Sequence, residues 1–123
     1  MPELSVTLPL PPAVLSPNNR CHWGTKAKAT KQYRAVTRTL AFMAMTEQKV
    51  AELPLLDTCK IQAVYFHKSW RRRDGDNFLA MLKSAFDGLT DAGVLADDSG
   101  VTHFPVMFKE DKRNPRVCLT IFW

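Results

Sequence analysis

Cysteine and glycine are scarce in this chain of 123 residues, which contains three cysteines and five glycines. The cysteines are far apart and form no CxxC pair, so the sequence predicts neither a disulfide framework nor a zinc ribbon and suits a reducing cytosol. No apolar run reaches the roughly 20 residues of a membrane span. The first 15 residues hold four prolines and no basic segment, unlike a signal peptide. We therefore expect a soluble, cytoplasmic protein with no membrane partner.

The charges are unevenly distributed along the chain, whose formal net charge is +5. Residues 1–73 contain 12 lysines and arginines against four acids, whereas residues 74–100 contain one lysine against six aspartates. A basic body with one acidic segment is typical of a protein that attracts nucleic acid and binds a cation. Basicity by itself is weak evidence, because many basic proteins bind no nucleic acid.

The length fits one domain, residues 1–123, with its own hydrophobic core. Turn residues at 16–20 predict a loop that continues through Lys26 and Lys28. Helical spacing of apolar residues predicts a helix over about 30–52, closed by Pro54. The same spacing predicts a second helix, with Asp76 or Asn77 as its N-cap and its end before Gly93. Alternating, β-branched and aromatic residues predict strands at 4–8, 59–66, 101–109 and 116–122. The β-α-β-α-β-β order indicates an α+β fold, a small mixed sheet flanked by two helices.

Two pairs of aspartates flank the second predicted helix. Asp74 and Asp76 precede it, and because residues i and i+2 of an extended backbone point to the same side, both carboxylates are expected to converge on one ion. Asp97 and Asp98 follow it, so the chain must double back to bring Asp98 beside the first pair. Oxygen donors without histidine or cysteine suit Mg²⁺ or Mn²⁺ rather than zinc.

Lys83 adds a cation to this acidic segment. It stands seven residues after Asp76, which places it on the same face of the predicted helix, one heptad along. A lysine there can stabilise charge that develops on a phosphate, while a metal-bound water attacks phosphorus. The pattern therefore predicts a metal-dependent enzyme that acts on a polyanion.

Each of these features also has an ordinary structural explanation. Asp76 fits a helix cap, and Lys83 with Asp87 fits an exposed i, i+4 ion pair. Asp97 and Asp98 fit a turn, and the arginines at 71–73 fit a solvated loop. We favour a functional site because all of these features occur together.

The motif Arg71-Arg72-Arg73-Asp74-Gly75-Asp76-Asn77, followed by Lys83-Ser84-Ala85-Phe86-Asp87-Gly88-Leu89, Ala92-Gly93 and Asp97-Asp98, resembles the RusA family of Holliday junction resolvases. The opening Leu8-Pro9, Pro11-Pro12 and Asn18-Asn19-Arg20 is similar to that family as well. The resemblance implies a phage- or prophage-type endonuclease of a bacterial or phage-infected cell. Such an enzyme is a homodimer that uses Mg²⁺, with Mn²⁺ as a possible substitute, to nick opposing strands of a four-way DNA junction.

The resemblance also implies roles for individual residues. Asp74, Asp76 and Asp98 match the metal-binding catalytic carboxylates, and Lys83 matches a catalytic lysine. Lys83 stands six residues after Asn77, farther along the chain than in the best-known pattern of the family.

We expect basic side chains to hold the DNA backbone without reading its sequence. Arg71, Arg72 and Arg73 are expected at the mouth of the site, and the wider junction surface is expected to comprise Asn19, Arg20, Lys26, Lys28, Lys31, Arg34 and Arg38. The products would carry 5′-phosphate and 3′-hydroxyl ends. Two alternatives stay open: a metal nuclease for other branched DNA, and a non-catalytic protein that binds branched DNA. No chemical role is assigned to His22, His67, His103 or the cysteines.

Overall fold

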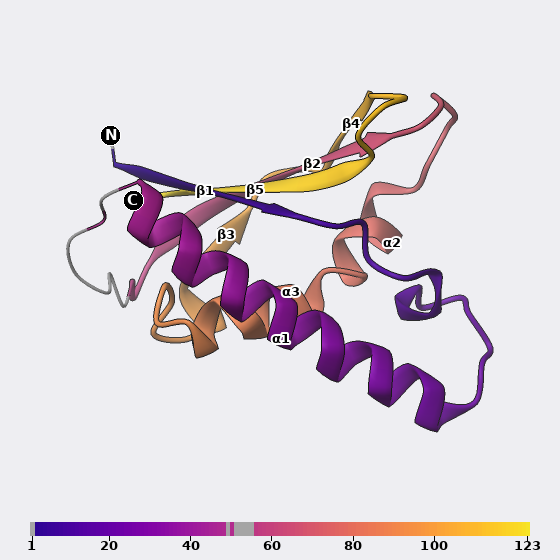
Figure 1. Cartoon of the computed structure of the whole chain (residues 1–123), viewed down its shortest axis with the longest axis horizontal. Helices are drawn as coiled ribbons and strands as arrows, with labels where there is room; N and C mark the ends of the chain where they lie inside the picture. Colours follow the sequence, from indigo (N-terminus) through magenta and orange to yellow (C-terminus); the bar gives the residue numbers. More distant parts are fainter. Residues whose placement is uncertain (1, 49, 51–55) are drawn as a thin grey trace.

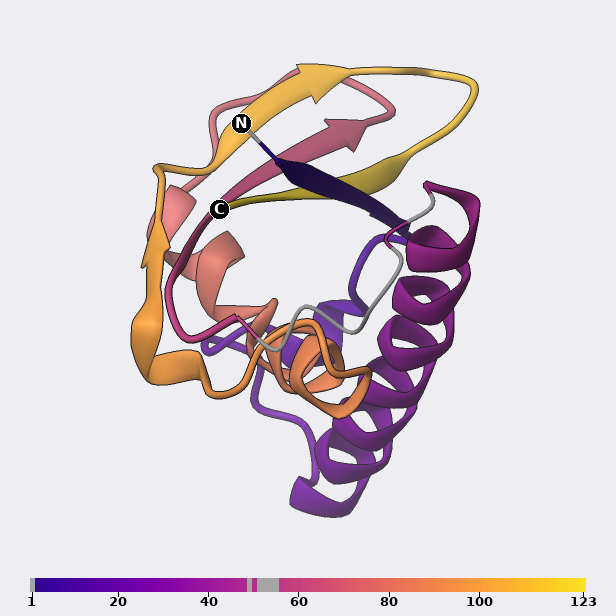
Figure 2. The same ribbon diagram turned by 90° about the vertical axis from the view of Figure 1, so that its left-hand side faces the viewer.

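The computed structural model describes residues 2–48, 50 and 56–123. In this part of the chain a five-stranded mixed sheet forms one layer, and helices α1 and α3 lie together on one side of it (Figures 1 and 2). The helices are α1 (Trp23–Glu47), α2 (Gly75–Ala80) and α3 (Lys83–Asp91), with short 3₁₀ turns η1 (Ala13–Leu15) and η2 (Asp98–Gly100). The strands are β1 (Glu3–Leu8), β2 (Cys59–His67), β3 (Val101–His103), β4 (Met107–Glu110) and β5 (Arg116–Phe122). The predicted α+β class, with a small mixed sheet, is confirmed.

The sheet combines antiparallel and parallel pairing around β2. Its order is β1-β5-β2-β3, and β4 also pairs with β2. Strands β1 and β2 both run antiparallel to β5, whereas β3 and β4 run parallel to β2. Leu4 of β1 and Ile61 of β2 both lie opposite Ile121 of β5, so these three residues form one row across the sheet.

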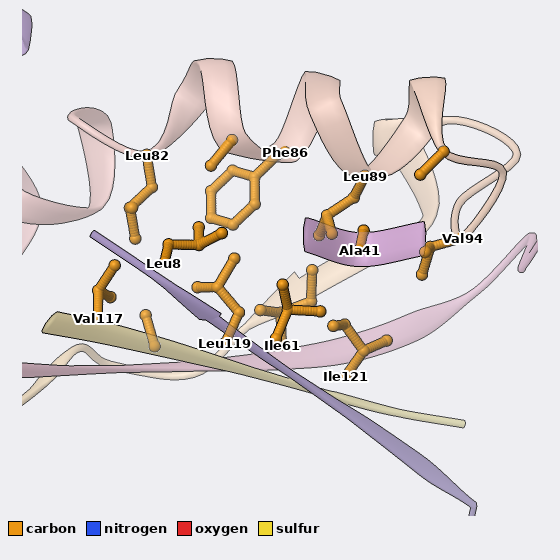
Figure 3. Close-up of a cluster of buried hydrophobic side chains, with 14 of the residues drawn as sticks. Leu8, Ala41, Ile61, Leu82, Phe86, Leu89, Val94, Val117, Leu119 and Ile121 are labelled. Atoms are coloured by element: carbon orange, nitrogen blue, oxygen red, sulfur yellow. The ribbon is translucent and has the colours of Figure 1, made fainter. Parts of the chain in front are cut away.

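The core lies between the sheet and the two long helices (Figure 3). Along β1 and β5 every second residue is buried, as alternation of apolar residues predicts for a sheet with one covered face. Phe86 and Leu89 of α3 meet this face from the helical layer (Figure 3). Burial of each large side chain stabilises the fold by roughly 1.5–3 kcal/mol. Fully buried members include Leu4, Val6, Leu8, Ile61, Tyr65, Leu82, Leu89, Val117, Leu119 and Ile121.

Helix α1 begins earlier than its apolar spacing predicted. Its N-cap is His22, whose Nδ1 accepts a hydrogen bond from the amide of Gly24 at 3.1 Å. Lys26 and Lys28 therefore lie on the helix, and the prediction of a basic loop there was wrong. The helix ends at Glu47 rather than at residue 52, and Pro54 lies outside the described residues.

The second predicted helix is broken into α2 and α3 at Met81 and Leu82. In an unbroken helix the amide of Leu82 would bond to the carbonyl of Phe78. Here that carbonyl accepts the hydroxyl of Tyr65 at 2.7 Å, and the amide of Leu82 donates to Leu79 instead. Gly93 follows the C-cap of α3 with a φ of 84°, as predicted for a C′ glycine.

The strand predicted at 101–109 is interrupted between β3 and β4. Pro105 lies in the interruption, where it has no amide hydrogen for a strand ladder, and its carbonyl accepts a hydrogen bond from Gln62 Nε2 at 2.8 Å. Both pieces still pair with β2. Among the described residues, no helix combines the length and apolar character needed to cross a membrane.

Candidate active site

The first aspartate pair lies at the start of α2. Asp74 is the N-cap of this helix, and its Oδ1 accepts a hydrogen bond from the amide of Asp76 at 2.9 Å. Asp76 lies in the first turn, so neither Asp76 nor Asn77 is the cap, and the expected extended i, i+2 arrangement was wrong. Both carboxylates are exposed and lie at the positive end of the helix dipole, which favours negative charge.

The second pair lies where the chain enters η2. Asp97 caps this turn, because its Oδ1 accepts a hydrogen bond from the amide of Ser99 at 3.2 Å. Asp98 instead accepts a hydrogen bond from Lys83. The two neighbouring carboxylates therefore have different tasks: one holds the turn and the other faces the start of α3.

Gly100 fixes the position of η2 against the chain that leads into β2. A Cβ atom at this residue would lie 1.7 Å from the carbonyl oxygen of Asp57, which no side chain permits. The segment that carries Asp98 is therefore pressed against backbone, and its placement depends on a residue without a side chain.

Lys83 joins the two acidic segments of α3 and η2. Its Nζ lies 2.9 Å from Asp98 Oδ2 and 3.0 Å from Asp87 Oδ1. The hydrogen bonds to Asp98 and Asp87 raise the pKa of Lys83, and the same contact with Lys83 lowers the pKa of Asp98. Lys83 is the first residue of α3, so the inference that it shares a helix face with Asp76 was wrong. The i, i+4 pair with Asp87 is present, and Lys83 also reaches Asp98.

A cavity of about 200 Å³ lies beside Lys83, between α1 and α3. Lys26 lines it from the first turns of α1, and its Nζ donates to the carbonyl of Ser16 at 3.2 Å. The buried hydroxyl of Ser84 also lines it and has no hydrogen-bond partner among the described residues. One member of the predicted DNA surface, Lys26, thus lies at the same cavity as Lys83.

The donor chemistry of the three aspartates suits a hard divalent cation, because each supplies carboxylate oxygen. The three carboxylates do not, however, lie together as one group. Asp74 and Asp76 share the start of α2, and Asp98 is bound to Lys83. In the part of the chain that the structure describes, no three His, Cys, Asp or Glu side chains lie together as a group that could hold a metal ion.

The residues predicted to bind DNA fall into two groups. Lys26, Lys28, Lys31, Arg34 and Arg38 lie on α1, within Trp23–Glu47, and Arg71, Arg72 and Arg73 lie in the loop before α2. Asn19 and Arg20 lie between η1 and α1.

Several members of these groups have intramolecular partners. Arg34 donates two hydrogen bonds to Asp91, at 2.6 and 2.8 Å, and thereby links α1 to α3. The guanidinium of Arg38 lies 5.3 Å from the ring centre of Phe42. Asn19 Oδ1 accepts a hydrogen bond from the amide of Cys21 at 3.1 Å, a turn contact. Arg34 and Asn19 therefore have structural roles beside any contact with DNA.

His67 lies beside this basic loop, although the sequence suggested no role for it. It lines a second cavity together with Arg71 and Arg73. A signal was available, because His67 stands two residues after the buried Tyr65 on β2, and alternate residues of a strand share a face.

Comparison with known proteins agrees with the motifs at this site. A family model described as endodeoxyribonuclease RusA matches residues 11–122, a span that contains both aspartate pairs and Lys83. An uncharacterized protein of Xylella fastidiosa (strain Temecula1 / ATCC 700964) is 33% identical over 117 residues, which cover 95% of this chain and 74% of that protein.

Proposed function

Since the chain belongs to the RusA family of endodeoxyribonucleases, we propose that it is a Mg²⁺-dependent nuclease that resolves four-way DNA junctions by paired nicks. The observation that carries the proposal is the family match, which spans nearly the whole chain and includes the arginine-aspartate motif. The contact between Lys83 and Asp98 supports it, because it places a cation at the second acidic motif of the family.

Asp74, Asp76 and Asp98 would hold the metal ion, with Mn²⁺ as a substitute for Mg²⁺. The ion, when bound, supplies an activated water and stabilises charge on the leaving oxygen. Lys83 orients Asp98 through a hydrogen bond of 2.9 Å, and the same contact lowers the pKa of that carboxyl. Asp74 fixes the start of α2, and with it the position of Asp76. We expect the bound DNA phosphate to contribute the remaining oxygen ligands.

The basic residues of α1 and of the loop before α2 would hold the DNA backbone. Contacts of this kind position DNA and weaken steeply as salt rises. A homodimer would offer two equivalent sites to a junction of near two-fold symmetry, as paired nicks require. In a reaction of this class the nicked strands end in 5′-phosphate and 3′-hydroxyl groups, and we place the reaction in the cytoplasm.

The test is cleavage of a labelled synthetic four-way junction beside a linear duplex of the same sequence, with Mg²⁺ or with EDTA. We expect paired nicks in the junction alone and only with the metal. Asp76→Asn should abolish cleavage, because it removes a carboxylate that would hold the metal. It should keep junction binding, because the lysines and arginines that hold the DNA are unchanged. Glu3→Gln, an exposed acid on β1, is the matched control and should cleave like the wild type.

Two results would contradict the proposal. Equal or faster cleavage of flaps or other branched DNA would indicate a metal nuclease of different substrate shape. Tight junction binding without cleavage in Mg²⁺ or Mn²⁺ would indicate a non-catalytic protein that binds branched DNA.

A further inference from the structure

A cavity beside His67 is lined by no carboxylate, and His67 itself has no part in the proposed cleavage reaction. The cavity measures about 200 Å³, between the end of β2, the loop before α2 and the proline-rich segment that follows β1. We call it the His67 cavity. Its lining residues are Leu10, Pro11, Ala13, Tyr65, His67, Arg71, Arg73, Phe78 and Met81.

The walls of the His67 cavity are flat and held in place. The rings of Tyr65 and His67 are stacked, with centres 5.5 Å apart and planes 6° apart. Phe78 meets both rings edge-on, at 5.0 and 5.5 Å. The hydroxyl of Tyr65 is bonded to the carbonyl of Phe78, so this wall is fixed to the start of α2.

Two residues that line the cavity each carry a buried polar atom without a partner among the described residues: His67 Nε2 and Arg73 Nε. The terminal nitrogens of Arg73 donate to the carbonyls of Ser69 and Arg71, at 3.2–3.4 Å, so the guanidinium is held in place while its Nε–H stays unused. Burial, together with Arg73 and Arg71, lowers the pKa of His67 and favours the neutral imidazole. Buried polar groups normally have partners, so a ligand that pairs with either atom would remove an unfavourable desolvation.

The chemistry of the lining selects the class of ligand. The lining contains two guanidinium groups and one imidazole but no carboxylate, so it favours a ligand with hydrogen-bond acceptors. Most of the remaining surface is apolar or aromatic, which suits a flat ring better than a hydrated phosphate. A planar ring with acceptor atoms on its edge meets both conditions.

We propose that the His67 cavity binds a single unstacked nucleobase of the DNA substrate, whose edge supplies the hydrogen-bond acceptors and whose ring meets the apolar wall. The inference rests on the proposed function, because branched DNA supplies the base. Arg73 directly precedes Asp74, and Phe78 follows Asp76 by two residues, so the base would belong to a nucleotide close to the phosphate that is cut. A base at a branch point is less firmly stacked than one inside a duplex and is extruded at lower cost.

The test combines base removal with side-chain removal. Junctions that carry one abasic site at successive positions around the branch point are bound in EDTA, so that no cleavage occurs. We expect one position at which base removal weakens wild-type binding roughly 5- to 150-fold, the range of a stacked base. In His67→Ala this position-specific loss should shrink to near zero, while losses at other positions persist.

Two further variants make the result specific. His103→Ala removes a histidine that packs against Phe86 away from the cavity, at 4.6 Å, and should keep the position-specific loss. Ala13→Leu fills the cavity from η1 without removing any of its polar atoms and should behave like His67→Ala. Ala13→Leu decides the matter if His67→Ala does not fold.

Four results would overturn the inference. An identical loss in the wild type and in both cavity variants, or no position with a loss, would show that no base enters the cavity. A neutral methylphosphonate linkage could also weaken wild-type binding at one position. If His67→Ala removed that loss but not the loss from an abasic site, the cavity would hold a phosphate. A wild-type protein that does not bind the junction at all would contradict the proposed function as well, so the two failures are distinguishable.

Discussion

Lys83 Nζ donates a hydrogen bond to Asp98 Oδ2 at 2.9 Å, which joins residues 15 positions apart in the chain. The contact shows that the chain turns back after α3, and it brings Asp98 to Lys83, whereas the sequence had suggested a return to Asp74 and Asp76. Gly100 secures this return, since its close approach to Asp57 leaves no room for a side chain.

Replacement of Lys83 should separate a role in chemistry from a role in folding. We expect Lys83→Ala to lower the rate of junction cleavage by roughly 10²–10³-fold, the size of one lost electrostatic contribution, because Asp98 loses the group that orients it. Junction binding should change much less. Asp87→Asn is the control, because it leaves the contact between Lys83 and Asp98 in place. Single-turnover cleavage is the measurement, and an equal loss in both variants would contradict a role for the contact between Lys83 and Asp98.

Metal binding should depend on DNA. Because the described residues contain no group of three metal-binding side chains, we expect weak binding of Mg²⁺ to the free protein. Titration calorimetry gives the Mg²⁺ concentration that half-saturates the free protein. Cleavage of bound DNA should reach half its maximal rate at a lower Mg²⁺ concentration than this. Asp98→Asn should raise the Mg²⁺ concentration that cleavage requires. Equal midpoints for the two measurements would show that the site is complete without DNA.

Gly88 sets the distance between α1 and α3. A Cβ atom there would lie 2.6 Å from the carbonyl oxygen of Arg34 and 2.8 Å from Thr37 Cβ. We expect Gly88→Ala to lower the free energy of unfolding by about 1–3 kcal/mol, the usual cost of overpacking. Gly75→Ala, with no atom within 4 Å of the added Cβ, should be neutral or stabilising, because alanine favours a helix. Urea unfolding compares the two, and equal losses would contradict the steric argument.

The ion pair of Arg34 and Asp91 should contribute to the pH dependence of stability. The hydrogen bonds from Arg34 lower the pKa of Asp91 in the folded chain. A lowered carboxyl pKa adds stability above the unfolded value, about 3.9, and this stability is lost as the pH falls through the folded value. We therefore expect Asp91→Asn to lose less stability than the wild type between pH 6 and pH 3. Glu47→Gln, at the end of α1, is the control and should follow the wild-type curve in urea unfolding at each pH.

The features that the sequence predicted well are local ones. Alternation marked β1 and β5, because only one face of the sheet is covered by helices. Gly93 was identifiable as the residue after a helix, since its positive φ suits glycine. The motif around Asp74 and Asp76 indicated the family, which the match to residues 11–122 confirms.

The features that the sequence did not predict depend on contacts between distant residues. The break between α2 and α3 follows from the bond of the Tyr65 hydroxyl to the carbonyl of Phe78, 13 residues away. The early start of α1 depends on a histidine as N-cap, which is not a preferred capping residue. Metal binding by Asp74, Asp76 and Asp98 stays a prediction, because it concerns a ligand as well as the fold.

The pairing of β1 with β5 has a consequence for biosynthesis. Glu3–Leu8 is synthesised before the rest of the sheet, yet its partner is Arg116–Phe122, the last strand. A growing chain therefore cannot complete the sheet, or the covered core beneath it, until residue 122 has emerged. Translation that stops before β5 would leave β1 unpaired and β2 without its antiparallel neighbour. We expect such fragments to be degraded rather than to cut DNA. A folded nuclease would therefore form only when translation has continued through the end of β5, at residue 122.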